Sequence, residues 1–253
     1  MKRYSWKNKK RKMLVLTLLW VIVVVFIVAI IFGVHTKRSF INDINNNHFF
    51  YDKKIKLSTY DQQFEEDKDG LLNYEDISSI NDLIDKSDCV LKIKLVDEDK
   101  RKNCATSMLS KVQVVKVYKG KLLKKQCIML LEYIEPTKTS ILSVNGYNVI
   151  KKDKEYIVFL RKYKNRHYTI EHTSEEKLET DSIYIPISPV LGKYPVDDSY
   201  KKVELLDKKR LCEEDEPYKY ETVKKYEIFT DNPKVLKQYI FIGKQVHKKY
   251  GRK

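Results

Sequence analysis

The stretch SDCVLKIKL, residues 87–95, places an apolar side chain at every second position from Cys89 to Leu95 and sets Lys92 and Lys94 between them. Successive side chains of a β-strand point to opposite faces, so this alternation predicts a strand with one face buried and one face in water. The residues before it have helical spacing, and we therefore expect the chain to change from helix to strand near Ser87.

Further strands are predicted at about 107–119, 126–133, 155–161, 168–170 and 184–189. In the first of these, the apolar face changes between Val114 and Val115. A β-bulge at this point would restore the register and bend the strand, as the closure of a small barrel requires. Residues 155–161 are apolar on both faces, which predicts a strand at the centre of the sheet.

Two helices flank the predicted strands. Residues 75–86 have apolar side chains at helical spacing, with Asn73 placed to cap them. Near the C-terminus, Asp231-Asn232-Pro233 has the form of a helix start, with proline at the first helical position, and the helical pattern ends near Gly251. Short curved strands with flanking helices predict a mainly β fold built on a small barrel.

Residues 79–170 resemble a widespread ectodomain of uncharacterised membrane-anchored proteins of Gram-positive bacteria. The resemblance lies in residues 83–90, in residues 112–120 with their Val-Tyr-Lys-Gly ending, and in residues 155–160. These ectodomains are similar to the netrin/TIMP-like variant of the OB barrel, so the resemblance implies an OB-like or NTR-like fold. The chain departs from that pattern at Asp153, where a turn glycine is usual.

The resemblance supplies no site residues. The eukaryotic inhibitors of this fold use a free N-terminal cysteine to reach the zinc of a protease, whereas this chain begins with a basic tail and an apolar segment. The inhibitory role is therefore not expected to carry over.

Residues 13–34 contain no charged side chain. As a helix they would span about 33 Å, enough for a hydrocarbon core of roughly 30 Å. Seven basic side chains and no acidic ones lie in residues 1–12. The positive-inside rule then predicts a single-pass protein of the plasma membrane, with a cytoplasmic N-terminus, an uncleaved signal-anchor and an extracellular C-terminal domain.

The predicted organisation has five parts. They are a basic tail (1–12), a transmembrane helix (13–34), an Asn-rich stalk with little core (35–74), an OB/NTR-like barrel domain (75–200) and a C-terminal helical extension (201–253). Alanine occurs only twice while Lys, Asn, Ile and Tyr abound, which indicates an AT-rich and bacterial genome.

The net charge of +15 overstates how basic the predicted outer domain is, because seven of the basic side chains lie in residues 1–12. Residues 35–253 hold 43 basic and 35 acidic side chains, a net charge of +8. OB barrels often bind single-stranded nucleic acid, but an extracellular location argues against that partner. The membrane itself, an envelope protein or an anionic wall polymer are the partners that we expect.

One acidic stretch matches part of a calcium-binding loop. Residues 65–76 place oxygen ligands at Glu65, Asp67, Asp69 and Asp76, with Gly70 at the turn position. The first ligand is normally Asp and the last is normally Glu, and both are exchanged here. The alternative interpretation is a solvated acidic turn that caps the helix behind it. Calcium is the one cofactor that we consider.

Four cysteines, Cys89, Cys104, Cys127 and Cys212, lack the spacing of a zinc site. Two alternatives remain open for these cysteines, namely one disulfide or buried free thiols. We find no catalytic motif, so the first hypothesis is a non-enzymatic, membrane-anchored extracellular interaction module. A calcium-responsive surface protein is the alternative, and an envelope enzyme is the least supported.

Overall fold

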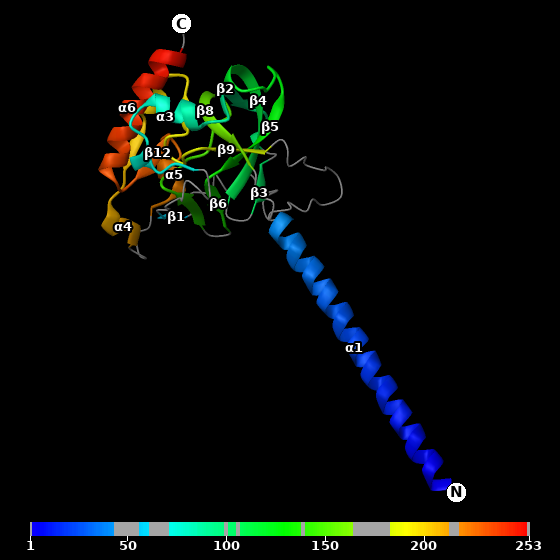
Figure 1. The fold of residues 1–253 in the computed structure, drawn as a ribbon. Coiled ribbons are helices and arrows are strands. Elements are labelled where there is room, and N and C mark those ends of the chain that lie inside the picture. Colours follow the sequence, from blue (N-terminus) through cyan, green and yellow to red (C-terminus); the bar gives the residue numbers. More distant parts are fainter. Residues whose placement is uncertain are drawn as a thin grey trace. The chain divides into compact units, whose positions relative to one another are not determined.

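The computed structural model describes residues 2–42, 56–60, 71–98, 101–104, 107–137, 140–163, 183–212 and 218–251. The chain forms two compact units, residues 1–43 and residues 44–253. The first is a single helix, α1 (Lys2–Asn42), seen in blue in Figure 1. Its stretch Met13–Gly33 is long and apolar enough to cross a membrane, and none of it is buried by the rest of the protein. This helix is a candidate membrane anchor.

The second unit contains a closed five-stranded barrel (Figure 1). Around it the strands follow the order β8 (Glu155–Lys162), β2 (Cys89–Leu95), β4 (Ser107–Lys119), β5 (Cys127–Glu132) and β9 (Ile183–Pro186), and β9 pairs again with β8. Only β5 and β9 run parallel, and the other pairs of the barrel are antiparallel. The predicted fold class, a small OB-like barrel with flanking helices behind an apolar helix, is confirmed.

The predicted bulge is present in β4. Lys92 of β2 is paired with Lys116 and Ile93 is paired with Val114, so Val115 has no partner in β2. A second shift leaves Tyr118 unpaired in the same way. Each extra residue bends the strand and increases its twist, which allows a sheet of only five strands to close.

Strand β8 is central, as its apolar pattern predicted. Every residue from Tyr156 to Leu160 is buried. One edge of β8 pairs with β2, and the other pairs with β10 (Lys193–Pro195) and with β9. The strand therefore has neighbours along both edges and side chains packed on both faces.

Smaller elements surround the barrel. They are β1 (Lys56–Tyr60), η2 (Tyr74–Asp76), α3 (Ile80–Lys86), β3 (Lys102–Cys104), β6 (Ile134–Pro136), β7 (Ser140–Val144), η5 (Asp198–Lys201), β11 (Val203–Leu205), α4 (Lys208–Cys212), α5 (Tyr220–Val223), β12 (Ile228–Thr230) and α6 (Pro233–Tyr250). Strands β1, β7 and β6 form a second sheet, and β11 pairs with β12.

The helix expected over residues 75–86 is broken into η2 and α3. The Asp82 carboxylate accepts hydrogen bonds from the backbone N–H groups of Ser78 and Ser79, both at 2.8 Å. The Ser78 hydroxyl donates to the same carboxylate and is the largest cause, ahead of the two backbone bonds, of a pKa of Asp82 below its usual value. The two serines provide a strong helix start at residue 79, and the chain before it leaves the helical path.

Segments expected outside the barrel domain pack into the same compact unit. Leu57, in the region predicted as a stalk, is buried in β1, and this strand pairs with β7. At the other end, α6 begins at the predicted position, with the Asn232 side chain accepting from Lys234 N–H at 3.0 Å. Its inner face shares a hydrophobic core with α3 and β8. Residues 44–253 form one compact unit, and the boundaries expected at 74 and 200 stay predictions.

Candidate functional site: a basic pocket beside the barrel

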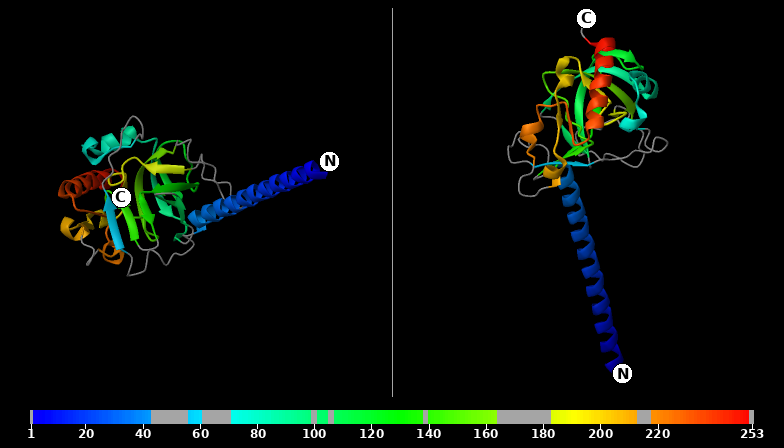
Figure 2. Two further views of the ribbon diagram at one scale, coloured as in Figure 1. Left: turned by 90° about the horizontal axis from the view of Figure 1, so that it is seen from below. Right: turned by 90° about the vertical axis from the view of Figure 1, so that its left-hand side faces the viewer.

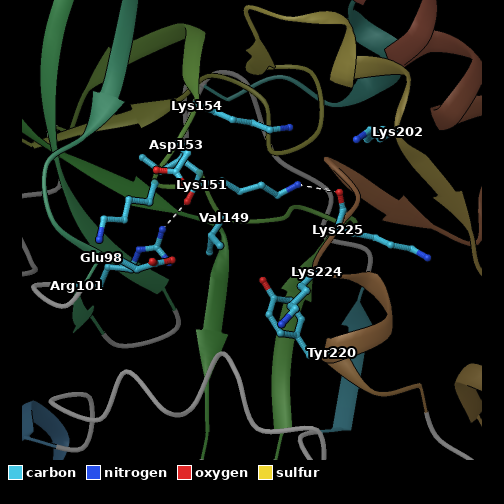
Figure 3. A pocket seen from close by; sticks show the side chains of 12 residues that line it. Glu98, Arg101, Val149, Lys151, Asp153, Lys154, Lys202, Tyr220, Lys224 and Lys225 are labelled. Carbon is cyan, nitrogen blue, oxygen red and sulfur yellow. Dashed lines mark hydrogen bonds and ion pairs between the residues drawn. The ribbon is translucent and has the colours of Figure 1, made fainter.

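A pocket of about 420 Å³ opens where the loop before β8 faces α5 and the turn behind it (Figure 3). Seven of its lining residues are basic and two are acidic. The basic residues are Arg101, Lys151, Lys152, Lys154, Lys202, Lys224 and Lys225, the acidic ones are Glu98 and Asp153, and the remaining three are Val149, Ile150 and Tyr220.

The loop that carries half of this lining is fixed to β12 by a close backbone approach. Gly146 has a φ of +82°, and a Cβ at this position would lie 1.8 Å from the carbonyl oxygen of Phe229. Only glycine fits such a position. The Gly146 carbonyl in turn accepts from Phe229 N–H at 3.1 Å. The start of the pocket loop is therefore held against β12.

Asn148 ties the same loop to α5. Its side-chain amide donates to the carbonyl of Tyr226 at 2.8 Å, and its carbonyl oxygen accepts from the Tyr220 hydroxyl at 2.6 Å. Asn148 is fully buried, so these hydrogen bonds are shielded from water. The two walls of the pocket are thereby joined beneath its opening.

Glu227 is a buried carboxylate behind the pocket lysines. Its Oε1 lies 2.9 Å from Lys151 Nζ and 2.8 Å from Lys154 Nζ. Burial alone would raise the pKa of Glu227, but the positive charges of Lys193, Lys151 and Lys154 outweigh it and lower this pKa. Glu227 is therefore ionised at neutral pH, and it fixes the direction of two pocket lysines.

Lys193 lies deeper and is fully buried. Its Nζ donates to the Asn148 carbonyl and lies 4.4 Å from the ring centroid of Tyr147. Burial lowers the pKa of Lys193 to about 8, against the opposing effect of Glu227 and Glu132. The ring face of a tyrosine attracts a cation, so the ammonium group is partly compensated where water cannot reach it.

Glu132 completes this buried polar network. It accepts hydrogen bonds from the Ser110 hydroxyl, from the Tyr147 hydroxyl at 2.8 Å and from Ile150 N–H at 2.8 Å. The three donors compensate the burial of this carboxylate, and the charge of Lys193 attracts it as well. The network orients Tyr147 against Lys193 and anchors the loop from below.

Arg101 forms one wall of the pocket, as Figure 3 shows. It is buried, it donates from Nη2 to the Ile150 carbonyl, and its Nη1 lies 3.9 Å from a Glu98 carboxylate oxygen. The opposite wall carries Tyr220 and Lys224 (Figure 3).

Three of the lining lysines, Lys152, Lys202 and Lys225, are exposed and therefore accessible from solvent. Lysine ammonium groups bind phosphate and carboxylate oxygens as point charges. Val149, Ile150 and Tyr220 offer an apolar floor beside these charges. Histidine, cysteine and serine do not occur among the twelve lining residues. This arrangement suits the binding of an anionic group with an adjoining carbon skeleton.

Of the predicted calcium ligands, only Asp76 lies among the described residues. Glu65, Asp67 and Asp69 lie outside the described residues. Asp76 is described, and its carboxylate accepts from Asn73 N–H at 2.9 Å in the capping box of η2. Within the described part of the chain, no group of three or more His, Cys, Asp or Glu residues could hold a metal ion. Calcium binding at residues 65–76 stays a prediction.

Of the four cysteines, Cys89 and Cys127 have described side chains, and both are free thiols. Cys89 is buried, and burial raises the pKa of its thiol to about 12. The side chains of Cys104 and Cys212 lie outside the described residues. Both described thiols are free, but Cys127 is exposed, so the buried free thiol that we considered is found only at Cys89.

Sequence reasoning missed the pocket because its basic residues come from separate segments. The local signals are short basic clusters, and each has the composition of an ordinary solvated turn. They are Lys100-Arg101-Lys102, Lys151-Lys152-Asp153-Lys154, Lys201-Lys202 and Lys224-Lys225. The buried Glu227 that organises them lies 76 residues from Lys151. Periodicity along the chain carries no information on such a pairing.

No family model, curated protein or solved structure matches this chain. The resemblance to netrin/TIMP-like domains therefore stays a prediction. The OB-like strand order does not depend on it, because the order follows from the pairing of β2, β4, β5, β8 and β9 alone.

Proposed function

We propose that this protein is a membrane-anchored binding module whose basic pocket holds an anionic group of a cell-envelope polymer. In this proposal α1 crosses the plasma membrane with its N-terminus in the cytoplasm, and the OB-like barrel lies outside the cell. The orientation is supported by the seven basic residues that precede the apolar segment.

The observation that carries the proposal is the excess of basic over acidic side chains in the pocket lining. Exposed lysines distributed at random are a common surface feature and bind little. Here a buried carboxylate, Glu227, orients Lys151 and Lys154 from behind, and Arg101 is buried in the wall. Placing fixed charges around a concave site is the arrangement that recognises a ligand of opposite charge.

The composition of the lining favours a polymer with phosphate groups on a polyol or sugar chain. Tetrahedral phosphate oxygens can be shared among several lysines, and the apolar floor accommodates carbon atoms between the phosphates. A flexible polymer with many identical units also gains from repeated rebinding at one site.

Binding is tested with the full-length chain in nanodiscs of zwitterionic lipid, using a soluble glycerol phosphate oligomer as the probe. The triple variant Lys152→Gln, Lys202→Gln, Lys225→Gln should weaken binding at least tenfold, which corresponds to about 1.4 kcal/mol. The matched control, Lys234→Gln, Lys237→Gln, Lys244→Gln on α6, removes the same charge away from the pocket and should stay within about twofold.

Equal loss in both triple variants would mean that net charge and not the pocket governs binding, and the proposed site would then be wrong. The topology has its own test. A protease added to intact cells should cut the C-terminal unit together with a known surface protein. Protection of that unit, while the surface protein is cut, would overturn the extracellular location.

A further inference from the structure

Helix α6 lies on the outside of the folded unit, along one side of the barrel (Figures 1 and 2). Seven residues of α6 are exposed, and five of them form a stripe that we call the α6 outer face. They are Lys234, Lys237, Phe241, Lys244 and Lys248.

These residues form one narrow stripe. At roughly 100° per residue, the five positions fall within an arc of about 80°. The buried residues of α6, among them Val235, Tyr239 and Val246, lie around the opposite direction. The helix packs one face into the core and presents a separate stripe of four lysines around an aromatic ring.

The charge of this stripe is not balanced within the helix. Residues 233–250 contain no aspartate or glutamate. Within the described part of the chain, no ion pair joins Lys234, Lys237, Lys244 or Lys248 to a carboxylate. A helix face that only faces water usually mixes both signs, whereas this one is purely basic.

Phe241 gives the stripe its second property. Its side chain is 54 % exposed, although it lies at the centre of the four lysines. A phenylalanine between lysines is the composition of a helix face that lies in the interface of a bilayer, with the ring among the acyl chains and the ammonium groups at the phosphates.

We propose that the α6 outer face docks onto the anionic lipid head groups of the membrane that holds α1. The four lysines favour an anionic partner, and the short segment between α1 and β1 keeps the α6 outer face close to the bilayer. Only 13 residues, 43–55, separate α1 from β1, and they span at most roughly 45 Å. A short tether of this kind raises the local concentration of the face at the bilayer to about the millimolar range.

The inference is independent of the pocket. None of the five residues lines it, and loss of polymer binding would leave the lipid contact untouched. It depends only on α1 being embedded in a membrane. Docking would hold the barrel in a defined orientation on the bilayer.

The experiment uses the full-length chain in two kinds of nanodisc, one of phosphatidylcholine alone and one with about a third phosphatidylglycerol. Lysines are modified with an amine-reactive ester at low salt, and each site is quantified by mass spectrometry. We expect Lys234, Lys237, Lys244 and Lys248 to react at least threefold more slowly in the anionic discs. Lys152, Lys202 and Lys225 of the pocket serve as internal controls and should react equally in both.

Phe241→Ser separates insertion of the ring from simple charge attraction. The variant removes one exposed ring, so the fold should persist, and the protection of the four lysines should fall at least twofold. Equal lysine reactivity in both discs would overturn the proposal, and so would equal protection of the pocket lysines. Unchanged protection in Phe241→Ser would overturn the insertion of the ring. Protection in zwitterionic discs that appears only with the glycerol phosphate oligomer would assign the face to the polymer instead.

Discussion

The pocket and the α6 outer face both present lysines to solvent, but the protein holds these lysines in different ways. In the pocket, Lys151 and Lys154 contact Glu227 at 2.9 and 2.8 Å, and the loop beneath them is hydrogen-bonded to α5. On α6, the lysines extend from a regular helix without such contacts among the described residues. The first arrangement fixes charge at chosen points, whereas the second supplies a band of charge beside an aromatic ring. Charges fixed at chosen points suit the binding of a single ionic group. A band of charge suits contact with a broad anionic surface.

The largest expected effect lies in the buried carboxylate of the pocket. Replacing Glu227 with glutamine leaves Lys193, Lys151 and Lys154 without their anion, and removing one partner of a buried charge pair costs about 3–5 kcal/mol. We expect a lower free energy of unfolding by about that amount, measured by urea denaturation with tyrosine near-UV circular dichroism. The control is Glu221→Gln, because Glu221 pairs with Lys224 at 2.7 Å in partly exposed surroundings, and its loss should cost below about 1 kcal/mol. Similar losses in the free energy of unfolding for Glu227→Gln and Glu221→Gln would show that the buried ion pairs contribute no more than a partly exposed one.

The second effect concerns the buried face of α6. A Cβ on Gly243 would lie 2.7 Å from the Tyr200 ring, so Gly243→Val overpacks the contact that holds α6 on η5. Overpacking of this kind costs about 1–3 kcal/mol, seen as a lower urea midpoint. Lys244→Val places the same side chain one residue further on, in solvent, and should change stability by less than about 0.5 kcal/mol. A Gly243→Val protein as stable as the wild type would show that the helix can shift outward freely.

The third effect is a pH dependence from Lys193. Its pKa in the folded protein is about 8 and its usual value is 10.5, so above pH 8 the unfolded chain binds more protons and stability rises with pH. Between pH 8 and 9 the gain should be about 1 kcal/mol. Above pH 9 the raised pKa of Cys89 has the opposite sign, because the unfolded thiol ionises first. Urea midpoints between pH 7.5 and 9 test this, and Lys193→Met should remove most of the rise. Burial also lowers the pKa of Lys151, which contributes with the same sign. An undiminished rise in Lys193→Met would show that Lys193 is not its source.

The smallest effect is expected at the exposed ring. Phe241→Ala should change the free energy of unfolding by less than about 0.5 kcal/mol, because the side chain is largely in water. Phe159→Ala, at a fully buried phenylalanine of β8, should cost about 3–5 kcal/mol in the same urea titration. A large stability loss at Phe241 would make the ring a structural residue and would weaken its assignment to the lipid interface.

Much of the barrel could be predicted from local patterns. The alternation in residues 87–95 predicted β2 within two residues, and the change of apolar face between Val114 and Val115 predicted the bulge. Both features are periodic, and periodicity reports which side of a strand is buried. The break between η2 and α3 was missed because the capping strength of Ser78 and Ser79 competed with a continuous helical pattern.

The candidate site could not be predicted in the same way. Lys193 lies in the short β10, where nothing in the sequence distinguishes a buried lysine from an exposed one. Its partners Asn148, Glu132 and Glu227 come from three distant segments, and only the folded chain brings them together. Contacts between charges that are far apart in the sequence depend on the fold, and they produce no periodic pattern in the sequence.

The close approach of Gly146 to Phe229 has a consequence for selectivity. Because the backbone beneath the pocket cannot move outward and Glu227 holds Lys151 and Lys154, the site adjusts to a ligand through the side chains of its exposed lysines. In such a site the charged ammonium groups can shift, while the backbone that carries them stays in place. The site would distinguish ligands by the number and spacing of their negative charges much more than by the outline of the groups between them.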